Sequence, residues 1–115
     1  MPDKKIWTLR RIAVVLVEFN VFPLGKGESV GDYVARCLKI VERSGLDYNC
    51  HAMGTAIEGE LAQVMDVVKQ CVEELATDCN RVECAMKLDY RKGHTGELRS
   101  RLSRVEQRLG HAVNK

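Results

Sequence analysis

Hydrophobic and polar positions alternate in four short stretches of the chain and recur with a helical spacing in three others. Alternation is typical of strands, whereas apolar residues three or four positions apart are typical of amphipathic helices. The expected strands are residues 12–22, 48–53, 55–58 and 82–90, and the expected helices are residues 29–44, 60–76 and 97–109. The predicted order is therefore strand, helix, strand, strand, helix, strand and a final helix.

This order predicts an α+β fold, a ferredoxin-like β-α-β-β-α-β sandwich with a four-stranded antiparallel sheet and an extra C-terminal helix. Right-handed crossovers place the first two helices on one face of the sheet and leave the other face open. We expect the first and fourth strands to be central. With 115 residues, the chain is expected to form one domain, residues 12–91, after an N-terminal extension, residues 1–11. Residues 92–115 are expected to form a loop and an amphipathic helix used in assembly.

Several side chains suggest helix ends or metal sites, and we weigh each of them. Ser29, with Asp32 three residues later, is predicted to cap the first helix. Five cysteines without a CxxC pair indicate reduced thiols, and Cys37, Cys71 and Cys84 fall at positions expected to be buried. The three histidines lack metal-ligand spacing, so no metal or cofactor is expected. His51 is expected near the open face, where an isolated histidine is typical of a surface residue.

The open face of the sheet is predicted to mix apolar and charged side chains. Its expected members are Leu16, Glu18, Asn20, Glu83, Lys87 and Asp89. A half-apolar face left bare forms an adhesive patch, so we expect a second copy of the chain to cover it. The pattern alone leaves two interpretations open, a salt-bridged but empty dimer interface and a ligand site between subunits.

Charge and hydropathy argue against nucleic-acid and membrane partners. Residues 91–115 carry seven Lys or Arg and two Asp or Glu, but their helical pattern favours a solvated helix face. The open face presents Glu18, Asn20, Lys87 and Asp89 where RNA-binding sheets present aromatic side chains. The apolar run 12–17 is short, is followed by Glu18 and lacks a cleavage site, so it predicts neither a signal peptide nor a membrane span. We therefore expect a cytoplasmic protein.

Three segments of the chain resemble one known family. Val17–Gly25, Met53–Gly59 and Met86–Arg91 read VEFNVFPLG, MGTAIEG and MKLDYR, and the second follows SGLDY at residues 44–48. They are similar to the family of small thiamine-binding proteins, long described as conserved proteins of unknown function, and the resemblance runs from Arg11 to Leu109. It implies a ferredoxin-like fold, a dimer or dimer of dimers packed through the sheets, and binding of thiamine or its pyrimidine portion. Asn20 stands where the family usually has Ser, and its larger amide adds two donors.

The chemistry of thiamine selects candidate residues. Thiamine has an aminopyrimidine and a cationic thiazolium, so carboxylates suit its ring nitrogen and its charge. An amide or hydroxyl can complete the hydrogen bonding, and Phe or Met can pack on a ring face. The candidate ligand-binding residues are Glu18, Asn20, Phe22, Met53, Thr55, Glu58 and Asp89.

An enzymatic role is not expected. No Ser or Cys nucleophile has a recognisable base partner in the sequence. The glycine-containing segment 25–29 precedes a helix but lacks a complete phosphate-binding motif, so a plain turn is favoured. We expect non-catalytic binding of thiamine or an aminopyrimidine precursor at a subunit interface. The alternative is a structural or regulatory homo-oligomeric module without a small-molecule ligand.

Overall fold

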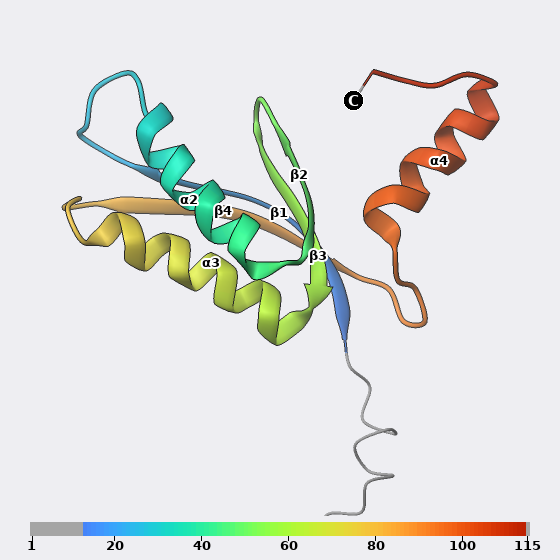
Figure 1. Ribbon diagram of the computed structural model, residues 1–115, viewed down its shortest axis with the longest axis horizontal. Coiled ribbons are helices and arrows are strands. Elements are labelled where there is room, and N and C mark those ends of the chain that lie inside the picture. Colours follow the sequence, from blue (N-terminus) through green and yellow to red (C-terminus); the bar gives the residue numbers. More distant parts are fainter. Residues whose placement is uncertain (1–12, 115) are drawn as a thin grey trace, which may run out of the picture.

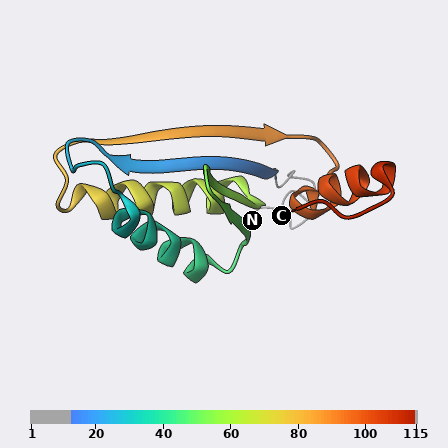
Figure 2. The ribbon, with the colours of Figure 1, turned by 90° about the horizontal axis from the view of Figure 1, so that it is seen from above.

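The computed structural model describes residues 13–114. Its elements are β1 (Val14–Pro23), α2 (Gly31–Ser44), β2 (Asp47–His51), β3 (Gly54–Glu60), α3 (Leu61–Ala76), β4 (Val82–Tyr90) and α4 (Glu97–Leu109). The strands form one antiparallel sheet in the order β2-β3-β1-β4, with α2 and α3 on one face and α4 beyond one end (Figure 1, Figure 2). The predicted ferredoxin-like α+β fold is confirmed. The expected N-terminal extension, residues 1–11, lies outside the described residues.

The central pair of strands differs from the prediction. We expected β1 and β4 to be central, and this is wrong, because β1 and β3 are central and β4 is an edge strand. The apolar alternation along β4 resembles that of a strand covered by helices. However, the helix-facing side chains of Met86 and Leu88 remain 41% and 40% exposed. Cys84, which was expected to be buried, is exposed for the same reason.

The core lies between the sheet and the two helices α2 and α3. Side chains at every second position of β1, including Val15 and Val17, point into it and are almost fully buried. The helices contribute residues at helical spacing. The buried members are Val15, Val17, Phe19, Val21, Cys37, Ile40, Val41, Ile57, Val64, Val67, Val68, Cys71, Leu75 and Cys79. The predicted burial of Cys37 and Cys71 is therefore confirmed.

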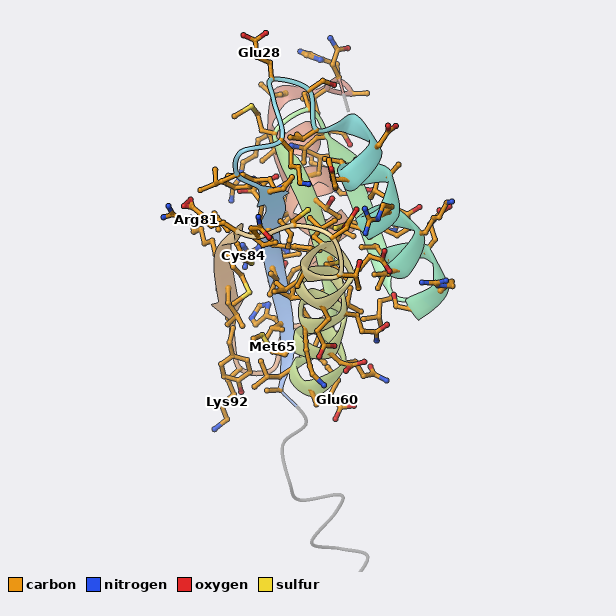
Figure 3. The ribbon with its side chains drawn as sticks, turned by 90° about the vertical axis from the view of Figure 1, so that its left-hand side faces the viewer. Glu28, Glu60, Met65, Arg81, Cys84 and Lys92 are labelled. Carbon is orange, nitrogen blue, oxygen red and sulfur yellow. The ribbon has the colours of Figure 1, made fainter. Side chains whose placement is uncertain are left out.

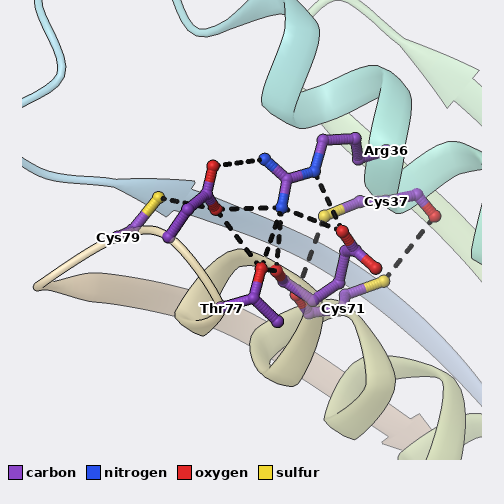
Figure 4. Close-up of polar contacts among 7 residues, drawn as sticks. Arg36, Cys37, Cys71, Thr77 and Cys79 are labelled. Carbon is purple, nitrogen blue, oxygen red and sulfur yellow. Dashed lines mark hydrogen bonds and ion pairs between the residues drawn. The ribbon is translucent and has the colours of Figure 1, made fainter.

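A bidentate arginine contact joins α2 to the C-terminal end of α3 (Figure 4). The Arg36 guanidinium donates to both carboxylate oxygens of Asp78 at 2.9 and 3.0 Å, and to Glu74 Oε2 at 2.8 and 3.0 Å. These hydrogen bonds hold the pKa of Asp78 below its ordinary value. The contact ties α2 to the C-terminal end of α3 on the helix-covered face of the sheet.

The start of α2 lies one residue later than the sequence suggests. The Val34 amide donates to the Val30 carbonyl at 3.0 Å, so Val30 occupies the N-cap position and no side chain caps this end among the described residues. The prediction of Ser29 as the cap is wrong, because Ser29 lies outside the first turn. The other end follows the expectation, since Gly45 has a φ of 72° and closes the helix.

Candidate functional site

The strand register arranges the open face in rows that cross the sheet. Directly paired residues of antiparallel strands point to the same face. One row contains Asp47, Glu58, Leu16 and Asp89, the next contains Asn49, Ala56, Glu18 and Lys87, and the pairs His51–Gly54 and Asn20–Ala85 follow. The predicted open-face position of the charged residues is thus observed, and acidic groups gather in the first row.

The N-terminal half of α4 contacts every acid of the first row. Arg101 Nη2 lies 2.7 Å from Asp89 Oδ2, and Arg99 Nη2 lies 3.4 Å from Asp47 Oδ1. Glu58, only 7% exposed, accepts hydrogen bonds from the backbone amides of Glu97 and Leu98. We call this region, Asp47, Glu58 and Asp89 with the start of α4, the capped end of the open face.

Glu58 acts as the N-terminal cap of α4. Its Oε2 lies 2.8 Å from the Glu97 nitrogen, and its Oε1 lies 3.1 Å from the Leu98 nitrogen. The local N-cap residue is Gly96, which has no side chain to perform this role. A carboxylate at this place satisfies free backbone donors and favours the positive end of the helix dipole. The carboxylate predicted to bind a ligand is therefore engaged in holding α4 on the sheet.

A buried carboxylate of α4 completes the capped end. Glu97 Oε2 accepts hydrogen bonds from Arg104 Nη2 at 2.9 Å and from Ser100 Oγ at 3.0 Å. These bonds lower the pKa of Glu97 from its ordinary value of 4.5 to about 2. The other oxygen, Oε1, is buried and lies 3.2 Å from His94 Nδ1, which donates to it only when that nitrogen carries a proton.

The opposite part of the open face carries a smaller polar cluster that α4 does not cap. Glu18 Oε2 lies 3.1 Å from His51 Nε2, and the Glu18 side chain is 57% exposed. His51 Nδ1 accepts a hydrogen bond from the Met53 amide at 3.3 Å, so Nε2 carries the proton that points to Glu18. Asn20 Nδ2 donates to the Met53 carbonyl at 2.7 Å. We call Glu18, Asn20 and His51 with the hairpin tip at Met53 the exposed end.

A close approach of two strands positions the amide of Asn20. A Cβ atom on Gly54 would lie 3.1 Å from Asn20 Oδ1 and 3.2 Å from the Phe19 carbonyl oxygen. Glycine at this position therefore allows the Asn20 side chain to lie against the hairpin. Because Nδ2 is held by Met53, the amide oxygen Oδ1 remains as an acceptor.

A groove adjoins the exposed end. It lies between β2 and α4, has a volume of about 640 Å³, and includes His51 and Asn49 on one side and Leu98 and Leu102 on the other. This volume falls in the range of small-molecule sites, about 300–1,000 Å³. The sequence predicts His51 near the open face but gives it no ligand-binding role. Its spacing from Asp47 and Asn49, at every second residue of β2, agrees with its place on this face.

The remaining candidates are distributed over both faces. Thr55 pairs with Phe19 on the helix-covered face and lines a small cavity of about 90 Å³ with Cys37 and Val41. Asn20 and His51 also border this cavity. The side chain of Met53 is exposed at the hairpin tip. Phe22 is half-buried opposite Glu83, at the far end of the open face.

Two further observations describe residues 13–114. No group of three or more His, Cys, Asp or Glu side chains in this part of the chain is arranged to hold a metal ion. None of its helices combines the length and the apolar character that are needed to cross a bilayer.

The sequence profile of the thiamine-binding protein family matches residues 17–106. The chain belongs to this family. The matched range begins in β1, ends within α4 and contains all seven candidate residues. Both ends of the open face therefore lie within the part of the chain that defines the family.

Relatives and solved structures agree with this membership. A UPF0045 protein of Mycobacterium bovis is 43% identical over 96 residues, which cover 83% of this chain and 94% of the relative. A hypothetical protein of Methanocaldococcus jannaschii superposes with a TM-score of 0.72 at 30% identity, covering 84% and 96% of the two chains. A Thermotoga maritima protein, provisionally named for thiamine biosynthesis or salvage, superposes with a TM-score of 0.69 at 25% identity, covering 80% and 98%.

Proposed function

We propose that this protein binds thiamine, or an aminopyrimidine precursor of it, at the exposed end of the open face and without catalysing a reaction. The observation that carries the proposal is the state of Glu18, a half-exposed carboxylate beside a fixed amide in a chain of the thiamine-binding family. The provisional name of the Thermotoga maritima protein supports thiamine chemistry as the class of ligand.

Each group of the exposed end has a counterpart in an aminopyrimidine. Glu18 accepts a hydrogen bond from a protonated ring nitrogen, and Asn20 Oδ1 accepts one from the exocyclic amino group. His51 donates to Glu18 and so holds the carboxylate in place. Phe22 and Met53 are the candidates for packing against a ring. Glu18 also supplies the negative charge that favours a thiazolium.

In this proposal, the remaining carboxylates do not contact the ligand directly. Glu58 and Asp89 are engaged by backbone amides and by Arg101, so their negative charge is already compensated. Their role in the proposal is to hold α4, whose Leu98 and Leu102 form the apolar wall of the groove. Thr55 has no role in the proposed site, because it lies on the other face.

A second copy of the chain is proposed to complete the site. A ligand lying on the exposed end would contact protein on one side only, whereas bound small molecules usually have most of their surface buried. A two-fold related copy packed on the open face would enclose the ligand and cover the apolar residues there. The proposed assembly is a dimer or a dimer of dimers.

Titration calorimetry with thiamine tests the function. We expect Glu18→Gln to weaken binding by roughly tenfold or more, because a buried ring nitrogen would lose its charged partner. Glu28→Gln, in the exposed turn between β1 and α2, removes a carboxylate that is not part of the exposed end. It is the matched control and should bind as the unmodified protein does. Equal affinities for all three proteins would refute the assignment of Glu18. No heat from thiamine or from its pyrimidine portion would favour the interaction module without a ligand.

A further inference from the structure

Two buried cysteines face each other between the helices α2 and α3. The Cys71 sulfur lies 3.7 Å from the Cys37 carbonyl oxygen, and the Cys37 sulfur lies 4.0 Å from the Cys71 carbonyl oxygen (Figure 4). Each sulfur therefore reaches the backbone of the other residue. The exposed fractions of Cys37 and Cys71 are 7% and 0%. A buried free cysteine often serves only as a small apolar side chain, but two thiols in reciprocal contact can also react with each other.

The arginine contact between the helices holds the two cysteines opposite each other. Arg36 precedes Cys37 on α2, and its guanidinium binds the side chain of Glu74 at 2.8 Å and the Glu74 carbonyl oxygen at 2.9 Å. Glu74 follows Cys71 by three residues on α3, so the two lie on the same face of that helix, about one turn apart. The helices are therefore fixed relative to each other within one turn of the thiol pair.

The surroundings of the two thiols give them different reactivity. Hydrogen bonding to the Cys71 side chain lowers the pKa of Cys37, and the positive charge of Arg36 acts in the same direction, whereas burial opposes both. Hydrogen bonding to Cys37, together with burial, raises the pKa of Cys71. The thiolate is the nucleophilic form of cysteine, so Cys37 is the thiol that reacts first with an oxidant.

A cavity gives a small oxidant access to Cys37. Cys37 lines the cavity of about 90 Å³ beneath the β2–β3 hairpin. His51 and Ala52, which also line it, are exposed residues, so the cavity reaches the surface. A single water molecule needs only about 10–15 Å³ of such space. Hydrogen peroxide is larger than water by one oxygen atom, so this cavity has room for it beside the Cys37 thiol.

We propose that Cys37 and Cys71 form a site of reversible oxidation, at which hydrogen peroxide converts the two thiols into a disulfide between α2 and α3. This modification goes beyond the proposed ligand binding. The Cys37 thiolate attacks one oxygen of the peroxide, the O–O bond breaks, and a sulfenic acid and a hydroxide ion form. The Cys71 sulfur then attacks the Cys37 sulfur, the S–O bond breaks, and the Cys71 proton leaves with the hydroxyl group as water.

The overall reaction is balanced and reversible. The two thiols lose two electrons and two protons, and one peroxide molecule becomes two molecules of water. A dithiol such as dithiothreitol restores both thiols by thiol–disulfide exchange and is itself oxidised to a disulfide.

Peptide mapping of the folded, full-length protein tests the site. After treatment with hydrogen peroxide, free thiols are alkylated and the protein is digested without reduction. Cleavage after Glu73 and Glu74 separates Cys71 from Cys79. We expect mass spectrometry to identify peptides that are linked through Cys37 and Cys71 in most of the chains. Alkylated Cys37 and Cys71, or a link from either of them to another cysteine, would overturn the proposal.

Two variants separate this pair from a third thiol. Cys84 is exposed on the edge strand β4, on the side of the molecule away from α2 (Figure 3). Cys84→Ala is the matched control and should form the disulfide as the unmodified protein does. Cys71→Ala should stop at the Cys37 sulfenic acid, which dimedone added with a denaturant labels. A folded Cys71→Ala variant without the label, or loss of the disulfide in Cys84→Ala, would overturn the proposal. If circular dichroism shows that Cys71→Ala is unfolded, the peptide map of the unmodified protein decides.

Thermal unfolding tests whether the disulfide fits the native fold. Cys37 and Cys71 are 34 positions apart, with β2 and β3 between them along the chain. A disulfide that closes so long a loop restricts the unfolded chain, so we expect oxidation to raise the midpoint of thermal unfolding by roughly 5 °C or more. Dithiothreitol should reverse the rise. A disulfide that leaves the midpoint unchanged or lowers it would overturn the proposal. Thiamine calorimetry with Glu18→Gln reports on the ligand site separately.

Discussion

The two ends of the open face use the same kinds of side chain but hold them in different states. At the capped end, Asp47, Glu58 and Asp89 all contact α4, and Glu58 is almost fully buried. At the exposed end, Glu18 stays half exposed and its ion-pair partner is a histidine. Both ends lie on the same sheet and about two residues apart along β1. The difference is therefore produced by α4, not by the strands.

This difference separates support of the fold from availability to a ligand. A carboxylate that already accepts two backbone hydrogen bonds or pairs with an arginine has most of its negative charge compensated. Such a carboxylate attracts a cation only weakly. A half-exposed carboxylate keeps its charge and its second oxygen for another partner. The comparison therefore predicts that substitutions at the capped end change stability, whereas substitutions at the exposed end change binding.

The largest expected effect is that of Glu58→Ala on stability. Removal of this carboxylate leaves the amides of Glu97 and Leu98 without their partner, and loss of a helix cap costs about 1–2 kcal/mol. Chemical denaturation measures the free energy of unfolding.

Glu18→Ala is the matched control for Glu58→Ala, because it removes a carboxylate from the same face without disturbing α4. We expect its unfolding free energy to lie within about 0.5 kcal/mol of the unmodified protein. Equal losses in the two variants would show that the two ends do not differ in their contribution to stability.

The second largest expected effect is the destabilisation of the capped end by acid. The folded-state pKa of Glu97 is about 2, below its ordinary value of 4.5, so its stabilising contribution is complete above pH 4.5 and is lost as the pH falls towards 2. The protection of the α4 amides, measured relative to the intrinsic exchange rate at each pH, should therefore fall over this range. Glu97→Gln, which cannot titrate, should lack this component, and an unchanged acid profile in that variant would contradict the prediction.

Most of the fold could be predicted from local patterns, but the neighbour of each strand could not. The alternation of Cys84, Met86 and Leu88 correctly indicates a strand and one apolar side. It is identical for a covered central strand and for an edge strand with an exposed apolar strip, so it does not determine the position of β4 in the sheet. The sheet order depends on crossover geometry, and only the structure shows that the helices leave these side chains uncovered.

Local patterns also limit what the sequence can predict about the candidate site. Side chains alternate along a strand, so Thr55 and Glu58, three residues apart on β3, had to face opposite sides. The spacing along the sequence therefore already separates these two candidates. The cap that Glu58 forms on α4 joins residues 39 and 40 positions apart. No local pattern reports such a contact, so the role of this carboxylate required the structure.

A smaller effect is expected from the ion pair between Arg101 and Asp89. Both side chains are about two-fifths exposed, and an exposed pair of this kind contributes about 0.5 kcal/mol, which solvent screening reduces at high salt. Arg101→Ala should lower the unfolding free energy by about that amount at low salt. Arg99→Ala is the control, because its contact with Asp47 is longer and more exposed. A larger loss for Arg99→Ala would mean that α4 is held mainly at its other side.

The smallest effect on stability, together with a loss of binding, is expected for His51→Ala. Its contacts with Glu18 and the Met53 amide are exposed, so the unfolding free energy should change by less than about 0.5 kcal/mol. Thiamine affinity should nevertheless fall, because Glu18 loses the donor that orients it. Thr55→Val is the counterpart on the covered face, where it replaces a buried hydroxyl with a methyl group. Calorimetry should therefore show weaker binding for His51→Ala and unchanged binding for Thr55→Val. The reverse ranking would move the ligand to the small cavity beneath the hairpin.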